Sequence, residues 1–441
     1  MGYTYTTISA MVTALRGYLG DNLTVKFWSD DELVRIVIES LRTWNVLARY
    51  TRTRDTFPTA DATPFYDLSV VLPAYFGYTV TSGDIMLMVE NALMEPEAYT
   101  VWTGTDMFTI DDIVKSIERR RNQFLLETGC VQSVLTYLGA PDTSGKIELA
   151  ETVMDVRAAH WITVDGVATP MFRSDEIAAR TFKSAWAQTP GVPTSFSTIL
   201  DNFPHVQLMP PALDEGTLEI VATSAGAPIN AAVPGTILGI PDDFAWVIKY
   251  GVLCDLLSTD PQSRDDTRST YCEKRWKEGV ELARTSISVL NLDINGRALG
   301  VQSLDAMMKF LRGWRNTPAR PRAFAMAGQN LLAVGPQADG VYGIGADLLS
   351  KFQIPTFITD PLDLAREVQM AVISYAQHVA MFKCGGAEFT ATMDEYRQML
   401  EVAAVQNDRL SAMAFYREAM ERSAQLQNED SPRLEVASGR A

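Results

Sequence analysis

The sequence contains few of the side chains that build metal and redox sites. Among its 441 residues there are three histidines, His160, His205 and His378, and four cysteines with no Cys-x-x-Cys pair. Zinc sites need several such ligands at close spacing, and disulfide frameworks need closely patterned cysteines. We therefore expect no metal, no cofactor and reduced cysteines, and we interpret His160 and His378 as hydrogen-bonded structural residues.

Positive charge and long apolar runs are also scarce. Lysine and arginine number 38 against 54 aspartates and glutamates, so the formal net charge is −16. A protein that grips DNA needs a positive footprint, and this chain as a whole repels DNA. Such a surface suits a channel past which DNA slides, and plain solubility explains it equally well. No apolar run approaches the roughly 20 residues of a membrane helix, so we expect no membrane contact.

Catalytic motifs are missing from the sequence. A glycine-rich segment at 139–147 resembles a phosphate loop, but it has five residues between its glycines instead of four, and Ile147 replaces the magnesium-binding Ser or Thr. Paired aspartates at 30–31, 111–112 and 242–243 lie at predicted helix starts, where capping and the helix dipole explain them. We expect a protein that is not an enzyme, with an enzyme whose site these patterns do not reveal as an alternative.

The first fifty residues predict a helical hairpin. The first helix, at about 7–19, is amphipathic and ends at Gly20, a residue that readily adopts the left-handed conformation. Ser29 and Glu32 form a capping-box pattern that opens the second helix. The apolar stripe of that helix consists of Leu33, Ile36, Val37, Leu41, Trp44 and Leu47.

The rest of the chain alternates between β-like and helical patterns. Strand candidates include residues 84–89, and a helix is predicted at about 174–187. Pro241 opens a pair of helices, and a similar order of strands and helices recurs after residue 300, so a duplication is an open alternative. The predicted segments are a helical hairpin at 1–55, a β-rich segment plus helix at 56–145, a β-rich segment with one helix at 146–235, a helical pair at 236–300, a second strand and helical-pair unit at 301–425, and a flexible C-terminal arm at 426–441.

These patterns together predict a mixed α+β fold that is predominantly α. We expect a ring-forming helical bundle assembled from both ends of the chain, with β-rich insertions at about 55–105 and 146–235. The last helix, predicted at about 389–423, has apolar residues that step by four and three, as in a coiled coil. This stripe packs either against the preceding helix or against another subunit, and its seam residues are Phe389, Met393, Tyr396, Leu400 and Leu410.

Two groups of basic residues are candidate contacts. Residues 306–338 contain no acidic residue, a local reversal of sign in an acidic chain. Three interpretations stay open, namely a strap that docks on an acidic neighbouring subunit, a contact with the DNA backbone, and a solvated loop. The candidate residues are Lys309, Arg312, Arg315, Arg320 and Arg322, together with Arg119, Arg120 and Arg121 on the predicted helix after residue 109.

Three segments resemble tailed-bacteriophage head-to-tail adaptor (neck, connector) proteins. They are FWSDDEL at 27–33, SIERRRNQFLLETG at 116–129, and IPDD at 240–243 leading through KYG at 249–251 to YCEKRW at 271–276. The resemblance implies a structural ring, typically of about twelve copies, that joins the capsid portal to the tail or nozzle proteins and surrounds the passing DNA without reading its sequence. It also implies a place in the neck of the virion and assembly in the bacterial host cytoplasm. Another tail-side component, such as a tail-tube, gatekeeper or baseplate part, is the alternative.

Overall fold

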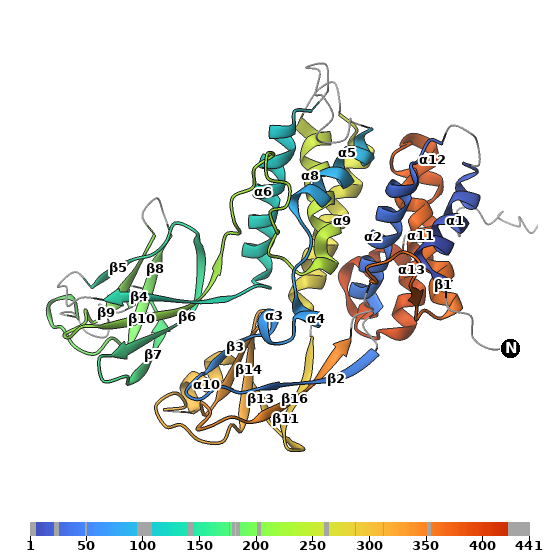
Figure 1. The fold of residues 1–441 in the computed structure, drawn as a ribbon. Coiled ribbons are helices and arrows are strands. Elements are labelled where there is room, and N and C mark those ends of the chain that lie inside the picture. Colours follow the sequence, from blue (N-terminus) through green and yellow to red (C-terminus); the bar gives the residue numbers. More distant parts are fainter. Residues whose placement is uncertain are drawn as a thin grey trace, which may run out of the picture. The chain divides into compact units, whose positions relative to one another are not determined.

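The chain folds into two units, each with its own packed elements (Figure 1). The terminal unit comprises residues 1–50, 91–94 and 352–441, and the insert unit comprises residues 51–90 and 95–351. The computed structural model describes residues 6–21, 26–48, 51–94, 108–139, 145–175, 177–178, 181, 186–200, 204–259, 264–286, 288–311, 313–350 and 354–421. The predicted C-terminal arm at 426–441 lies outside these residues.

The terminal unit is a helical bundle to which both ends of the chain contribute. Its helices are α1 (Ile8–Leu19), α2 (Asp30–Ala48), α11 (Arg366–Met381), α12 (Gly386–Ala391) and α13 (Met393–Gln406), followed by the 3₁₀ turn η3 (Leu410–Ala412). The short strands β1 (Thr6–Thr7) and β17 (Pro361–Leu362) pair antiparallel. Helices α1, α2 and α13 all contact α11 or one another, and Figure 1 shows them side by side.

Local capping and long-range hydrogen bonds explain how this bundle closes. Gly20 ends α1 with a φ of 66°, and the hydroxyl oxygen of Ser29 accepts the backbone N–H of Glu32 at 3.1 Å, as the hairpin pattern predicts. The Glu32 carboxylate pairs with Lys383, at 3.1 Å. The Trp28 indole donates to the carbonyl of Ala380 at 3.3 Å. Residues more than 300 positions apart are thereby joined.

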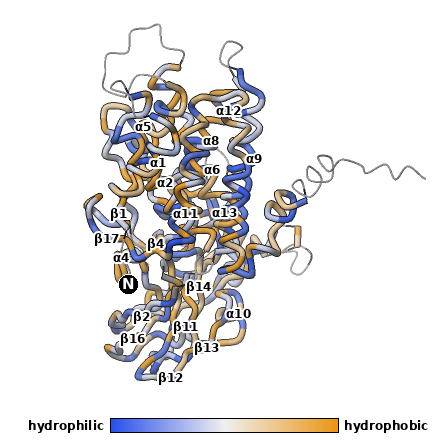
Figure 2. The backbone as a smooth tube through the Cα atoms, turned by 90° about the vertical axis from the view of Figure 1, so that its right-hand side faces the viewer, coloured by the Kyte–Doolittle hydropathy of each residue, from blue (hydrophilic) through white to orange (hydrophobic). Residues whose placement is uncertain are grey.

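The insert unit contains a group of packed helices. They are α6 (Ile110–Thr128), α8 (Ala245–Thr259) and α9 (Asp266–Thr285), with η2 (Asp242–Phe244) leading into α8. Helix α8 is buried nearly all round, as its apolar sequence predicts, whereas α9 is largely hydrophilic (Figure 2). The helices approach one another closely at two glycines. A Cβ on Gly279 would clash with the methyl groups of Val247, and a Cβ on Gly251 would lie 2.6 Å from the Trp276 ring.

A seven-stranded sheet forms the second part of the insert unit. The strand order is β4-β10-β6-β7-β8-β9-β5, and the sheet nearly closes into a barrel. Its core includes Trp161, Phe196 and Ile220. The strands are β4 (Ser133–Gly139), β5 (Lys146–Glu148), β6 (Val153–Thr163), β7 (Ala168–Arg173), β8 (Ser195–Ile199), β9 (His205–Met209) and β10 (Gly216–Ser224), with the 3₁₀ turn η1 (Trp186–Gln188) between β7 and β8.

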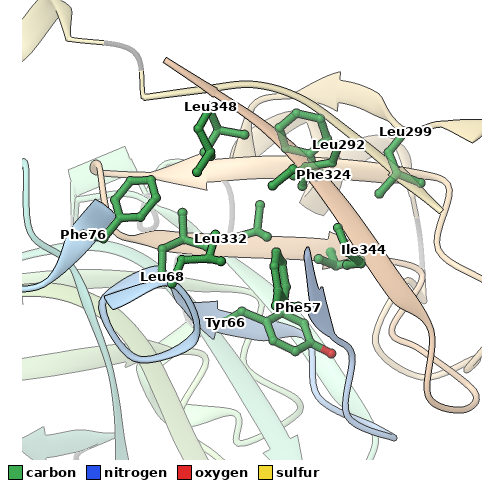
Figure 3. Close-up of a cluster of buried hydrophobic side chains, with 14 of the residues drawn as sticks. Phe57, Tyr66, Leu68, Phe76, Leu292, Leu299, Phe324, Leu332, Ile344 and Leu348 are labelled. Atoms are coloured by element: carbon green, nitrogen blue, oxygen red, sulfur yellow. The ribbon is translucent and has the colours of Figure 1, made fainter. Parts of the chain in front are cut away.

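Two four-stranded sheets enclose a further core in the insert unit. Their strand orders are β12-β11-β16-β2 and β13-β14-β15-β3. Figure 3 shows Phe57 and Tyr66 among Leu332, Ile344 and other apolar side chains of this core. The elements are β2 (Thr51–Pro58), β3 (Phe65–Asp67), α3 (Leu68–Val71), α4 (Pro73–Phe76), β11 (Val289–Ile294), β12 (Arg297–Ala298), β13 (Gly300–Gln302), α10 (Leu304–Phe310), β14 (Ala323–Ala327), β15 (Leu331–Gly335) and β16 (Gly343–Ser350).

The prediction of a predominantly helical bundle is wrong, although the mixed α+β class holds. Helices account for 45% of the structure and strands for 25%, and the described residues form four sheets. The strand predicted at 84–89 is also wrong, since these residues lie in α5 (Ser82–Leu93). The reason is capping, because the Asp84 carboxylate accepts the Thr81 backbone N–H at 2.9 Å and fixes a helix start before the apolar run.

The long final helix also needs revision. The predicted helix at 389–423 is interrupted, since α12 ends at Ala391, α13 begins at Met393, and a further break follows Gln406. The apolar periodicity of a sequence does not show where a helix is broken. Here Thr392 lies between the two helices, and its hydroxyl forms a hydrogen bond with the His378 side chain. Seven of the fourteen residues at 174–187 lie outside the described part of the chain, so this predicted helix is not tested along its length.

Candidate functional site

The three consecutive arginines on α6 are mostly used within the insert unit. Arg120 hydrogen-bonds through Nε to Asp255 at 2.8 Å, and its guanidinium lies 5.0 Å from the centre of the Trp276 ring. Arg119 pairs with the same carboxylate at 2.5 Å, although its side chain is 65% exposed. Burial by itself would raise the pKa of Asp255, but hydrogen bonds from Arg120 and Arg119 lower it below the ordinary value. Arg119 is therefore the accessible member of this group.

Arg121 lies wholly inside the unit. Its side chain is buried and donates to the carbonyl of Ala227 at 2.6 Å. Burial lowers the pKa of Arg121 from its ordinary value. A residue in this position holds the segment around 226–227 against α6, and its 0% exposed side chain offers no surface for a partner to contact.

Arg315, the centre of the acid-free stretch, is also internal. Its guanidinium forms a two-pronged ion pair with Glu219 of β10, and the second contact measures 2.9 Å. Both side chains are 9% exposed. His160 of β6 lies beside the pair, with Nδ1 3.8 Å from the Glu219 carboxylate, and its ring faces Trp314 and Phe65. Through this ion pair, Arg315 joins the seven-stranded sheet to the segment after α10.

His160 departs from our interpretation of a hydrogen-bonded histidine. It is 1% exposed, and neither ring nitrogen has a hydrogen-bond partner among the described residues. Burial, together with the positive charge of Arg315, lowers the pKa of His160 to about 3. His378 agrees with the interpretation, because its Nδ1 lies 2.9 Å from the Thr392 hydroxyl and its ring stacks on Phe389.

The remaining residues of the acid-free stretch lie at the surface or outside the described chain. Lys309 is exposed at the end of α10, with Nζ 6.0 Å from the centre of the Phe172 ring. Arg320 and Arg322 are exposed, and Arg320 donates to the carbonyl of Ile294 at 3.0 Å. Arg312 lies outside the described residues. The sequence did not associate Arg297 with this group, although the exposed hairpin at 294–297 brings it close to Arg320.

The seam residues of the terminal unit are divided among three short elements. Phe389 is buried on α12, Tyr396 and Leu400 are buried on α13, and Leu410 is buried in η3. Met393, at the first position of α13, is half-buried. Their burial within one chain favours packing inside the bundle, through contacts of α13 with α11 and α2.

A surface hollow of 560 Å³ lies on the open face of β2, β11 and β16. Arg54 spans part of it, pairing with Asp293 at 2.5 Å and with Asp347 at 3.4 Å. The carboxylate that lines the hollow, Asp347, is therefore held in an ion pair with Arg54, and this pair links β16 to β2. The hollow is lined by Arg52, Thr53, Arg54, Leu290, Asn291 and Asp347.

The described residues contain no group of three or more His, Cys, Asp or Glu side chains placed to hold a metal ion. Within the same part of the chain, no helix is both long and apolar enough to cross a membrane. Comparison of the sequence with models of known protein families gives no match, and comparison with characterised proteins gives none.

Proposed function

We propose that this chain is a structural, non-enzymatic protein of a tailed-bacteriophage virion. In this proposal its copies form a ring that joins the capsid portal to the tail and surrounds the DNA channel. Its location is the virion neck, its partners are the portal ring and the tail or nozzle proteins, and assembly takes place in the cytoplasm of the bacterial host.

The observation that carries the proposal is the segment at 27–33, which resembles the start of the second helix in neck adaptors. Trp28 in this segment is 6% exposed and donates to Ala380. Asp21 accepts the backbone N–H groups of Phe27 and Trp28, so the turn before α2 is held from both sides. The segment therefore organises a bundle that both chain ends share, which supports a role as an assembly module.

The other two resembling segments support the same proposal. Residues 116–128 lie in α6, whereas residues 249–251 and 271–276 lie in α8 and α9, respectively. Arg120 of α6 contacts both Asp255 and Trp276. The three helices thus belong to one packed group. The internal use of Arg120, Arg121 and Arg315 leaves fewer cations to hold DNA, which supports a channel past which DNA slides without sequence-specific binding.

The test is native mass spectrometry of the protein titrated onto the portal ring from the same genome. We expect a ladder of complexes that ends at one copy per portal subunit. Absence of portal binding would contradict the neck assignment and would favour another tail-side component. A monomer that retains a small molecule would favour an enzyme or binding protein instead.

A further inference from the structure

Three exposed arginines gather at one end of the two four-stranded sheets. Arg320 donates to the carbonyl of Ile294, which pairs across the β11–β12 hairpin with Arg297. The carbonyl of Arg322 accepts the backbone N–H of Gly300 at 2.8 Å. The hairpin, β13 and the segment before β14 therefore converge, and we call Arg297, Arg320 and Arg322 the arginine patch.

A surface of opposite sign lies at one end of the seven-stranded sheet. Gly216 of β10 pairs with Thr163 of β6 on one side and with Gly139 of β4 on the other. The exposed side chains next to these pairs are Asp165, Asp214, Glu215, Leu138, Val164 and Leu213, which we call the acidic tip. Its apolar members are 90% (Leu138), 77% (Val164) and 61% (Leu213) exposed.

Neither surface is neutralised within the described chain. The side chains of Arg297 and Arg322 have no ion-pair partner among the described residues, and the same holds for the three carboxylates of the acidic tip. In a chain with 54 acidic and 38 basic residues, arginines that find no carboxylate are unexpected. Exposed apolar side chains among charged ones are typical of interaction surfaces.

We propose that the arginine patch of one copy docks on the acidic tip of a second copy. Guanidinium groups bind carboxylates through two parallel hydrogen bonds, and Leu138, Val164 and Leu213 lose water when the surfaces meet. The two surfaces differ, so the contact is heterologous and can repeat around a closed ring. This proposal rests on the proposed function for the ring, and it adds the residues that join neighbouring copies.

The test exchanges the charges of the two surfaces. The patch variant is R297E/R320E/R322E, and the tip variant is D165R/D214R/E215R. Each variant alone places like charges in contact, so we expect self-association measured by sedimentation velocity to weaken about a hundredfold. An equimolar mixture restores opposite charges at every contact and should assemble as the wild type does, which also shows that both variants are folded.

A control variant separates the contact from the change in net charge. R52E/R157E/R366E alters three exposed arginines outside the patch by the same total charge, and it should assemble like the wild type. A wild-type chain that remains monomeric, a patch variant that assembles normally, a mixture that fails, or a control that loses assembly equally would each overturn the proposal.

The same variants distinguish this proposal from the proposed function. If the wild type binds the portal ring and the patch variant binds it equally well and with the same stepwise affinity, the neck assignment stands and the docking proposal is wrong. If charge exchange controls self-association but no chain binds the portal, the docking proposal stands and the neck assignment is wrong.

Discussion

His160 should make the folded chain sensitive to mild acid. In the unfolded chain this histidine takes up a proton as the pH falls through about 6.5, whereas burial and Arg315 lower its pKa in the folded state to about 3. Between these values the unfolded state binds more protons, so the free energy of unfolding decreases as the pH decreases. The contribution of His160 to the free energy of unfolding is complete well above pH 6.5 and is lost progressively as the pH falls toward 3.

The size of the effect follows from the linkage relation. One pKa unit corresponds to about 1.4 kcal/mol, and the unfolded histidine is already half-protonated at pH 6.5. Lowering the pH from 7.0 to 4.5 should therefore remove about 2.5 kcal/mol through His160 alone. No discount for solvent screening is needed, because the side chain is 1% exposed. The ring lies beside the ion pair of Arg315 with Glu219 and faces Trp314 and Phe65, which have no titratable group in this interval.

The assay is urea unfolding of the wild type and H160Q at pH 7.0 and pH 4.5. Carboxylates with lowered pKa values, such as Asp255, contribute to both proteins and cancel in the comparison. At pH 7.0 H160Q should be no more stable than the wild type. On acidification to pH 4.5 its free energy of unfolding should decrease by about 2.5 kcal/mol less than that of the wild type. Equal losses in wild type and H160Q would refute the reasoning.

Other substitutions test the packing. R315M should destabilise by about 3–5 kcal/mol because it leaves Glu219 buried and unpaired, and R315M/E219L should cost less than R315M alone in chemical denaturation. F124A and W44A should each cost about 3–5 kcal/mol, since both side chains are buried, and an unchanged Tm would contradict that placement. G279A should cost about 1–3 kcal/mol, whereas an Ala substitution that left the unfolding midpoint unchanged would show that α8 and α9 can separate.

Local signals in the sequence predicted several helix starts and one helix end well. Gly20 ends α1, Ser29 caps α2, and Thr109 accepts the backbone N–H of Asp112 at the start of α6, all in agreement with capping patterns in the sequence. These features depend on residues within four positions of one another. The same locality explains the error at α5, where an apolar run of strand-like length concealed a helix fixed by Thr81 and Asp84.

The sheets and the fate of the arginines could not be predicted in the same way. Phe57 pairs with Ile344 across 287 positions (344 − 57), and no local pattern specifies that register. The basic neighbours of Arg315 in the sequence predict a surface cation. Its partner Glu219 lies 96 positions earlier, in β10 of the seven-stranded sheet, so no local pattern could reveal the pair. Arg320 and Arg322 retained the predicted exposure, since the residues that surround them lie in a hairpin and an edge segment.

Ion pairs inside the unit increase the difference in charge between the arginine patch and the rest of the surface. Pairs such as Arg120 with Asp255 and Arg315 with Glu219 remove equal charges of both signs, so the net charge of −16 remains at the surface with fewer cations to balance it. Copies of such a chain repel one another over about 30 Å at 0.01 M salt and over about 8 Å at 0.15 M. Contacts between guanidinium and carboxylate groups act at shorter range and survive the higher salt concentration.

Self-association should therefore depend on salt in two directions. It should strengthen as salt rises from 0.01 M toward roughly 0.15 M, because long-range repulsion is screened first, and weaken toward roughly 1 M, where the Debye length of about 3 Å reaches the contact itself. The patch variant should lose the weakening at high salt, since it has no attractive ion pairs left to screen. A monotonic strengthening in the wild type would mean that apolar surface alone joins the copies, and the arginine patch would then be a solvated surface.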